Sequence, residues 1–218
     1  MPADTPAAGR RQRVPALSPD ERRAALVAAT IPLLQAHGPT VSTRQIARAA
    51  GVAEGTIFGV FSDKAALLAA TVLSAFDPET TLVSLRAIAT EAPLRERLTE
   101  ATRVLTERLS ARMNLMVTVH THPTAFGDHK ELMSQLNAGR ERVTAAVVEL
   151  LEPDRHRLRR SPDSIAQLLM WLVTVAVRTE EFGKNDVNTL DRDDIVPLLL
   201  DGVLLRPSCH HGEETTGC

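Results

Sequence analysis

The side chains best suited to chemistry gather in one short stretch of the sequence, between Thr43 and Lys64. Hydroxyl, guanidinium, carboxylate and ammonium groups alternate there, on Thr43, Arg44, Glu54, Thr56 and Lys64. Up to Lys64 the chain has eight arginines and lysines against five acidic residues, whereas the remainder has 17 against 22. A basic front on an acidic body suits a module that meets an anion. The chain shows no nucleophile–base pattern, no phosphate loop and no paired carboxylates in a recognisable motif, so an enzyme is disfavoured.

Two short helices around a tight turn must position these side chains, one over residues 42–50 and the other over residues 53–61. Gly51 lies where the chain must leave the first helix with a positive φ, which costs glycine little. The inner faces are small and apolar, with Ile46, Ala47 and Ala50 on the first helix and Val52, Ile57 and Phe61 beneath the second. This is the layout of a helix-turn-helix, whose second helix places its N-terminal residues at base edges in the major groove.

The same stretch resembles a known family in many fixed positions over 26 residues. The pattern is Thr43-x-x-Ile46-Ala47-x-x-Ala50-Gly51-Val52-x-x-Gly55-Thr56-Ile57-Phe58-x-x-Phe61-x-x-Lys64-x-x-Leu67-Leu68. It is similar to the DNA-binding signature of the tetracycline-repressor (TetR) family. The alternative is an ordinary pair of packed helices that never meets DNA. Packing alone would not need Thr43, Gly55-Thr56 and Lys64 together, so we disfavour that alternative.

The resemblance implies a DNA contact for several of these positions. Thr43 would hold a phosphate by its hydroxyl and backbone N–H, and Arg44 beside it would reach a phosphate or a base edge. Thr56 would contact the backbone or a thymine methyl, and Lys64 would clamp a phosphate. Phe58 stands where the family usually has a phosphate-binding tyrosine, so one hydrogen bond of about 1 kcal/mol per half-site is missing.

Two departures from the family pattern concern sequence readout. Glu54 lies at a base-reading position, where a carboxylate repels phosphate but can accept from a cytosine amino group. Gly59 leaves the second helix without a side chain where the family often has a large one. The arginine-rich arm (Arg10, Arg11 and Arg13) is expected to add salt-dependent affinity. For Arg44 and Glu54 taken singly, a solvated surface role is an open alternative.

The pattern of the whole chain predicts an all-α protein of about nine helices. Aromatic residues make up 3%, tyrosine is absent, and no stretch alternates apolar and polar residues. We expect a flexible arm over 1–16, a three-helix helix-turn-helix DNA-binding domain over 17–63, a larger ligand-binding and dimerisation domain over 64–206 and a flexible tail over 207–218. Ser18 and Glu21 form a capping box for the first helix, in which Pro32 should cause a kink. Further helices are expected over residues 64–76, 79–90, 93–121, 128–151, 162–181 and 193–205.

By family resemblance, an apolar pocket with a few polar anchors would lie in the larger domain. The candidate lining residues are Asn114, Met116, His120, Phe126, Met133, Asn137, Trp171 and Thr174. A metal site is a competing interpretation of His120 and His122 with Asp128 or His129. Residues two apart on a helix point to different faces, so a polar helix end is favoured and no metal is predicted. A metal site at Cys209, His210 and His211 is likewise less favoured than a disordered tail.

Two late helical segments are apolar on more than one face, so each needs two partners. The resemblance implies a homodimer in which these two helices of each chain form a four-helix interface. The candidate residues for it are Leu168, Leu172, Val175, Ile195, Leu198 and Leu199. A fully buried hairpin within one chain is the alternative.

These observations favour a ligand-responsive, DNA-binding transcriptional regulator that acts as a repressor. Its partners would be a pseudo-palindromic double-stranded DNA operator, a second copy of itself and a small apolar or amphipathic molecule, with no cofactor. The alternative is a helical small-molecule-binding or scaffold protein with a degenerate DNA-binding head. No run reaches the roughly 18 apolar residues of a membrane span, the first residues lack a signal peptide's apolar region, and Cys209 and Cys218 are the only cysteines. We therefore expect no membrane partner and a cytoplasmic protein.

Overall fold

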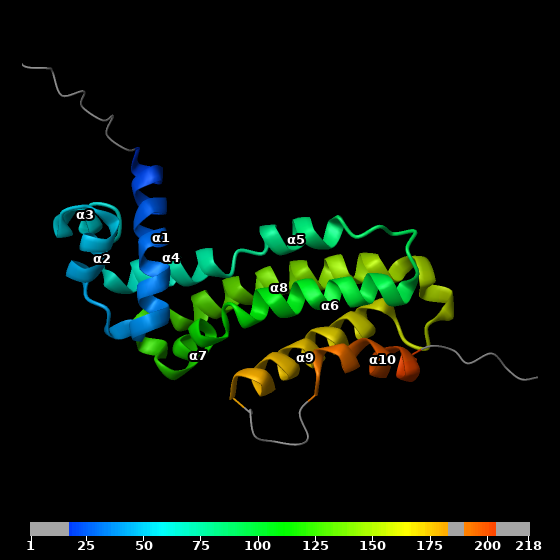
Figure 1. Ribbon diagram of the computed structural model, residues 1–218. Helices are drawn as coiled ribbons and strands as arrows, with labels where there is room; N and C mark the ends of the chain where they lie inside the picture. Colours follow the sequence, from blue (N-terminus) through cyan, green and yellow to red (C-terminus); the bar gives the residue numbers. More distant parts are fainter. Residues whose placement is uncertain (1–17, 183–189, 204–218) are drawn as a thin grey trace, which may run out of the picture.

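The computed structural model describes residues 18–182 and 190–203, and this part of the chain is helical without a strand (Figure 1). The prediction of an all-α fold is confirmed. The α-helices are α1 (Pro19–His37), α2 (Thr43–Ala50), α3 (Glu54–Phe58), α4 (Lys64–Ala75), α5 (Glu79–Arg86), α6 (Leu94–Ser110), α7 (Met113–Thr121), α8 (His129–Leu151), α9 (Pro162–Phe182) and α10 (Arg192–Val203). Three 3-10 turns join them: η1 (Gly38–Thr40), η2 (Pro123–Phe126) and η3 (Glu152–Arg157). The predicted arm and tail, including Cys209, His210 and His211, lie outside the described residues.

Helix α1 begins and ends where the local sequence predicts. The Ser18 hydroxyl accepts from the Glu21 amide while the Glu21 carboxylate accepts from the Ser18 amide, which completes the capping box. The helix ends at Gly38, whose φ of 58° favours glycine. The helix continues across Pro32, whose side chain is exposed.

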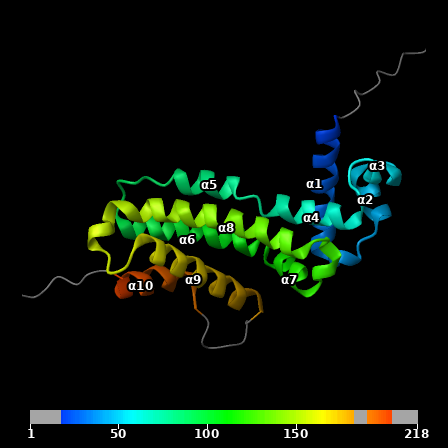
Figure 2. The ribbon, with the colours of Figure 1, turned by 180° about the vertical axis from the view of Figure 1, so that it is seen from behind.

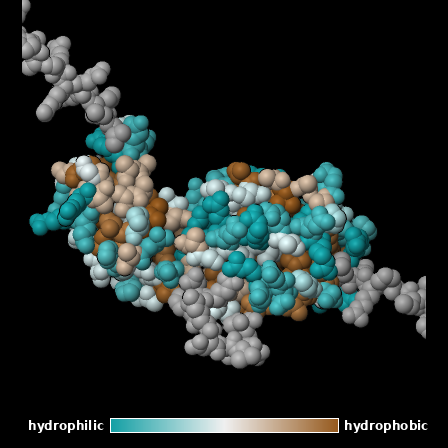
Figure 3. Space-filling view, in the orientation of Figure 1, coloured by the Kyte–Doolittle hydropathy of each residue, from teal (hydrophilic) through white to brown (hydrophobic). Residues whose placement is uncertain are grey.

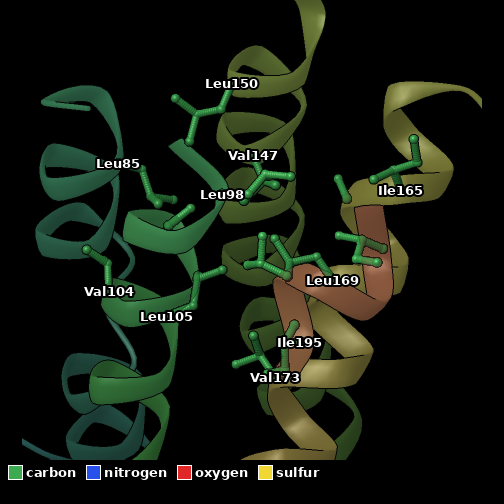
Figure 4. Packing of buried hydrophobic residues seen from close by; sticks show 14 of the residues in the cluster. Leu85, Leu98, Val104, Leu105, Val147, Leu150, Ile165, Leu169, Val173 and Ile195 are labelled. Carbon is green, nitrogen blue, oxygen red and sulfur yellow. The ribbon is translucent and has the colours of Figure 1, made fainter. Parts of the chain in front are cut away.

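A small head and a long body are visible from both sides (Figures 1 and 2). Helices α1, α2 and α3 form the head, and α4 leads from it into the body. In the body, α5, α6 and α8 run alongside one another, and α9 and α10 cover the opposite side of α6 and α8. Figure 4 shows how the body core is filled from five helices, with Leu85 from α5, Leu98 from α6, Val147 from α8, Leu169 from α9 and Ile195 from α10.

The apolar core of the head does not end at the predicted boundary between residues 63 and 64. It contains residues from α1, α2 and α3, from α4, and also from α7, η2 and α8. The body contributes Leu115, Val119, Phe126 and Leu132, all of which are buried in it. The core of the head therefore includes residues of the body and is distinct from the body core. Helices α4 and α7 and the turn η2 connect the head to the body through it.

One expected helix, over residues 93–121, is two helices in the structure. Helix α6 ends at Ser110, and α7 begins at Met113 in a new direction. Neither glycine nor proline marks this break, so the sequence gives no local signal for it. The break allows α6 to fill the body core through Leu105 while α7 buries Leu115 in the head core. A single straight helix would not reach both cores.

An apolar stretch, residues 64–86, has the length and mean hydropathy of 1.2 that would allow it to cross a membrane. The chain is interrupted after Ala75, however, and continues as α5 from Glu79. Helix α4 has 12 residues and α5 has eight, and each is too short for a hydrocarbon core of about 30 Å. Their buried residues pack into the two cores described above, which is the ordinary reason for apolar helices in a folded protein.

The far end of the body is closed by a buried ion pair. Arg97 of α6 pairs with Asp154 of η3, with side chains 3% and 13% exposed, and it also donates to the Thr90 carbonyl. Burial alone raises the pKa of the Asp154 carboxyl, but hydrogen bonds from Arg157 and Arg97 outweigh burial and leave that pKa below its ordinary value of 3.8. The charged pair thus holds η3 against the start of α6.

We expect Asp154→Asn to lower the free energy of unfolding by about 3 kcal/mol at neutral pH, because it leaves the Arg97 charge buried and unpaired. Since the folded pKa of Asp154 is depressed, its contribution is present above pH 3.8 and is lost as the pH falls below that value. Urea unfolding of both proteins between about pH 7 and pH 3 measures this. Equal stabilities at neutral pH, or a difference that persists below the folded pKa, would contradict the assignment.

Candidate nucleic-acid interface and body cavity

The turn between α2 and α3 is fixed by its backbone. Ser42 and Gln45 form a second capping box at the start of α2. Gly51 has φ 69° and ψ 29°, the left-handed conformation that the sequence predicts for it, and the Val52 amide donates to the Ala47 carbonyl at 3.0 Å. Ile46 and Ile57 are fully buried beneath the turn. The two helices therefore present one rigid outer surface.

The predicted DNA-contact residues come together on this outer surface. Thr43 and Thr56 are half-buried, and the others on α2, α3 and the C-cap of α3 are exposed: Arg44, Glu54, Gly55, Phe58 and Gly59. Arg48, one turn after Arg44 on α2, is also exposed and adds a second guanidinium. The sequence motif did not select Arg48, although its spacing from Arg44 places it on the same side of α2.

Gly55 in α3 and Gly59 at its C-terminal cap are not demanded by the interior of the protein. A Cβ at Gly55 would meet no atom within 4 Å, and one at Gly59 would meet only the Thr56 carbonyl at 3.5 Å, an ordinary contact. Neither glycine has a positive φ. Because these two positions lack side chains, nothing projects from them beyond the backbone, and an external surface can approach that backbone closely.

Thr43 and Glu54 are hydrogen-bonded to each other. The Thr43 hydroxyl, at the start of α2, donates to the Glu54 carboxylate, at the start of α3. The hydroxyl proposed for a phosphate is therefore satisfied internally in the free protein. Phosphate binding through that hydroxyl would require it to leave Glu54, whereas the Thr43 backbone N–H does not depend on this contact.

Lys64 also has an internal partner. Its ammonium donates to the Pro39 carbonyl at 2.7 Å and is partly buried, so it ties the start of α4 to η1. An ammonium has three donors, so two remain for an external anion. Nearby, the Arg23 guanidinium lies 4.4 Å from the centre of the Phe61 ring, which joins α1 to the end of the motif. Lys64 thus has a structural role beside any role in DNA binding.

A cavity of about 180 Å³ lies in the body, next to the shared core. It is lined by the end of α4, by α5 and α6, by the α6–α7 connection and α7, and by α8 and α9. Of the predicted ligand residues, Met116, Met133, Asn137 and Thr174 line it. The structure places the other four elsewhere: Asn114 and His120 are exposed on α7, Phe126 is buried in the head core, and Trp171 is exposed on α9.

The cavity carries charge that the sequence analysis missed. Arg108, Arg112 and Arg140 line it, together with an apolar wall that includes Phe76 and Leu105. Arg108 and Arg112 are four residues apart, which would place them on one face of a continuous helix. The helix breaks at residues 111–112, however, and the sequence did not predict this break, so their position at the cavity could not be inferred. Arg140 was hidden because α8 alone does not show which of its faces meets α6.

The histidine cluster resolves into separate local contacts. The His120 ring Nδ1 lies 2.8 Å from the Met116 carbonyl, and the His122 ring Nδ1 lies 2.9 Å from the Thr121 hydroxyl. Asp128 accepts from the Glu131 amide and is the N-cap of α8. Within residues 18–182 and 190–203, no three histidine, cysteine or acidic side chains are placed to share a metal ion.

The predicted dimer residues divide between the core and the surface. Ile195 and Leu199 are buried in the body core, and Leu172 is half-buried against it. Leu168, Val175 and Leu198 are 44%, 46% and 57% exposed, and Trp171, at 61%, stands between Leu168 and Val175 on α9. We call Leu168, Trp171, Val175 and Leu198 the α9–α10 apolar face. In the view of Figure 3, hydrophilic residues separate small apolar patches over much of the body.

Comparison with known proteins supports both parts of this architecture. Residues 26–71 match the model of the bacterial regulatory proteins of the tetR family. A TetR-family transcriptional regulator from Mesorhizobium loti MAFF303099 has a TM-score of 0.69 at 17% identity, covering 87% of this chain and 100% of that one. The reduced form of NemR from E. coli has a TM-score of 0.66 at 17% identity, covering 86% and 100%. No curated protein sequence matches the chain.

A third similar structure is the regulator FadR from Bacillus subtilis in complex with stearoyl-CoA, with a TM-score of 0.61 at 17% identity, covering 82% of this chain and 98% of that one. At these identities the structural likeness shows the fold. The chain therefore has the fold seen in TetR-family transcriptional regulators, and residues 26–71 match the model of that family.

The open space around Gly55 makes a test that separates stability from binding. We expect Gly55→Ala to raise the free energy of unfolding by about 0.5–1 kcal/mol, because alanine is the better helix former and meets no neighbour. The same change should weaken DNA binding, because the added methyl keeps the surface of α3 further from the duplex. Thr99→Ala in α6 is the control, since Thr99 is exposed, alanine is likewise the better helix former there, and α6 lies far from α3. Urea unfolding and DNA retention measure the two effects; unchanged DNA binding by Gly55→Ala would contradict close approach there.

Proposed function

We propose that this protein is a cytoplasmic transcription regulator that binds operator DNA as a homodimer and responds to a small molecule, and not an enzyme. The observation that carries the proposal is the rigid helix-turn-helix surface, on which Thr43, Arg44, Arg48 and Thr56 surround a low α3 backbone. The match of residues 26–71 to the tetR-family model supports it. The cavity and the α9–α10 apolar face supply the other two functions that such a regulator needs.

In this proposal α3 enters the major groove with Glu54, Gly55 and Thr56 nearest the bases. Arg44 and Arg48, on α2, contact the phosphates on the side of the groove that α2 crosses. Glu54 contributes discrimination and not affinity, because a carboxylate accepts from a cytosine amino group but repels every phosphate. The internal bond from Thr43 holds Glu54 in the free protein, so this carboxylate is positioned before DNA arrives.

Dimerisation follows from the α9–α10 apolar face. A contiguous set of large apolar side chains left in water is unfavourable, and a second copy offers the same surface with two-fold symmetry. A two-fold dimer would present its two α3 helices to half-sites about 34–36 Å apart, or a near multiple, on a pseudo-palindromic operator. The proposed interface uses Leu168, Trp171, Val175 and Leu198, while Ile195 and Leu199 support it from the core.

The cavity is placed to influence the head. Phe76, at the end of α4, and Met116, in α7, both line it, and both helices contribute to the core that the head shares. The Ala111 carbonyl, in the α6–α7 connection, accepts from the Gln35 side chain of α1 at 3.3 Å. A ligand that shifts α4 or α7 would therefore tilt α1 and change the separation of the two heads, which shifts the population away from DNA. Two proteins of similar fold are described with a ligand: FadR is in complex with stearoyl-CoA, and FrrA is a flavonoid-responsive regulator.

Selection of random duplex DNA by the purified protein tests the proposal. We expect a pseudo-palindromic site, and we expect Arg44→Ala to weaken binding to it and to reduce its salt dependence by about one counterion per half-site. Arg103→Ala is the control, since Arg103 is also an exposed arginine but lies on α6, remote from the head. Absence of any enriched sequence at low salt would overturn the proposal and favour a helical small-molecule-binding protein with a degenerate head.

The same selection with Glu54→Ala tests the assignment of readout to that carboxylate. We expect the preference at one base pair of each half-site to relax by about 1–3 kcal/mol, while affinity for unrelated DNA rises because a negative charge is removed. An unchanged sequence logo would assign Glu54 to the solvated surface.

Leu198→Glu tests the dimer interface. We expect the wild type to have a mass twice the 23.7 kDa of the chain and the variant to be monomeric, because the new charge would be buried against the partner. Val83→Glu on α5 is the control, since Val83 is 65% exposed but lies outside the α9–α10 apolar face. Sedimentation equilibrium gives both masses. A Leu198→Glu protein that remains dimeric would place the interface elsewhere.

A further inference from the structure

The body cavity combines an apolar wall with three cationic side chains and no anionic one. Its charged residues are Arg108 from α6, Arg112 from the α6–α7 connection and Arg140 from α8. The remaining polar side chains of the lining, Thr81, Asn137 and Thr174, are neutral. None of the described residues that line the cavity is acidic. Three arginines thus line one small space in a chain whose net charge is −2, with the guanidinium of the exposed Arg140 at its outer edge beside Trp171.

None of these three arginines forms an ion pair with a described carboxylate. Elsewhere in the body such pairs are common, and Arg97, Arg103, Arg142, Arg155 and Arg157 each have an acidic partner. Instead, the Arg112 guanidinium lies 5.9 Å from the centre of the Phe76 ring, and the Arg140 guanidinium lies 6.0 Å from that of Trp171. Contact with an aromatic face leaves the edge of a guanidinium, with its N–H donors, available to an acceptor.

Arg108 and Arg112 are both half-buried, whereas Arg140 is exposed. Burial and then the like charge of Arg108 lower the pKa of the Arg112 guanidinium, and the nearby Asp77 carboxylate only partly opposes them. A guanidinium does not lose its proton in a protein, so the unfavourable energy remains as an unmatched charge. An anion placed between Arg108 and Arg112 would offset the cost of burial and the repulsion between the two charges.

We propose that the ligand of this regulator is an amphipathic anion, whose carboxylate or phosphate group binds Arg108 and Arg112 while its apolar part fills the cavity. Arg140 lies across the cavity on α8 and would meet the same anion or its polar linker. This inference rests on the proposed function, because it names the chemical class of the molecule to which the regulator responds. The fork of a guanidinium matches both a carboxylate and a phosphate, so the structure selects their shared chemistry.

The apolar part of the proposed ligand is inferred from the apolar side chains in the wall of the cavity. Leu105, Leu109, Met116, Met133, Val143 and Met170 line it. Three of these are methionines, which adapt to ligands of different shape. At about 180 Å³ the space is smaller than a typical ligand pocket of roughly 300–1,000 Å³, so a short alkyl chain or a single ring system suits it. Larger ligands would have to displace the methionines.

A neutral or cationic ligand fits the same lining poorly. A neutral apolar molecule would desolvate the guanidinium of Arg112 further and offer it no acceptor. A cation would meet the like charges of Arg108 and Arg112 in a partly buried space. Both would therefore bind more weakly than an anion with the same apolar part.

Four probes with one eight-carbon chain separate these possibilities: octanoate, octyl phosphate, 1-octanol and octylamine. Calorimetric titration into the full-length dimer gives each dissociation constant. We expect octanoate or octyl phosphate to bind at least about tenfold more tightly than 1-octanol, because the anion gains charge-assisted hydrogen bonds that the alcohol lacks. Octylamine should bind more weakly than 1-octanol. The ratio between octanoate and octyl phosphate distinguishes a carboxylate site from a phosphate site.

Matched variants assign the effect to the cavity. Arg112→Gln should lose most of the anion preference while binding 1-octanol as the wild type does, and Arg108→Gln should lose part of it. Arg112→Lys, which retains the charge without the fork, should be intermediate. Arg103→Gln is the control, because Arg103 is on the same helix as Arg108 but is exposed and paired with Glu100 and Glu107. Thermal unfolding of every variant confirms that it is folded.

The outcomes separate this inference from the proposed function, since DNA binding is measured without any probe. If the protein selects an operator but binds 1-octanol as tightly as both anions, or binds no anion, the ligand class is wrong and the regulator proposal stands. If Arg112→Gln retains the full anion preference, the anion binds elsewhere and the inference is overturned. If anions bind through Arg112 but no operator is selected, the proposed function fails while the anion site remains.

Discussion

The core that the head shares with the body is the constraint on which the rest of the structure depends. Leu115 and Val119 of α7, Phe126 of η2 and Leu132 of α8 are buried among residues of α1 and α4. Burying each large apolar side chain contributes about 1.5–3 kcal/mol, so separating the head from α7 and η2 would cost much of the stability of a small domain. The head therefore moves with these elements and does not swing on a free linker.

The break between α6 and α7 makes that shared core possible. It also places the end of α6 beside the cavity while α7 packs against the head. Because α7 turns away after Ser110, the end of α6 and Arg112 are left at the wall of the cavity, while α7 itself meets the head. The turn η1 fits closely against it, since a Cβ at Gly38 would lie 3.9 Å from the Thr118 methyl. Well-packed elements of this kind shift as units and do not deform smoothly, so in the proposed mechanism a small displacement at the cavity would be transmitted to α1.

The sequence predicted what local patterns encode. The capping box at Ser18, the left-handed Gly51 and the all-helical fold were confirmed because each depends on residues close together in the chain. The cavity was only half foreseen, since membership in its wall depends on how α6, α7, α8 and α9 cross, which periodicity does not show. Trp171 illustrates this: its type suggested a ligand wall, but α9 turns it outward beside Leu168. Phe126 was misplaced for the converse reason, because η2 folds back onto α4 and buries it in the head core.

Charge distribution explains why such a protein would need two heads. The chain is acidic overall, and Glu54 sits at the proposed DNA surface, so attraction to the phosphates is weaker than in a strongly basic domain. Lys64, moreover, donates one hydrogen bond to the Pro39 carbonyl, and the Thr43 hydroxyl donates to the Glu54 carboxylate. One head would consequently hold DNA weakly at physiological salt, and useful affinity would require both half-sites at once. Affinity that depends on two simultaneous contacts is lost when their spacing changes, which makes a small tilt of α1 sufficient to release DNA.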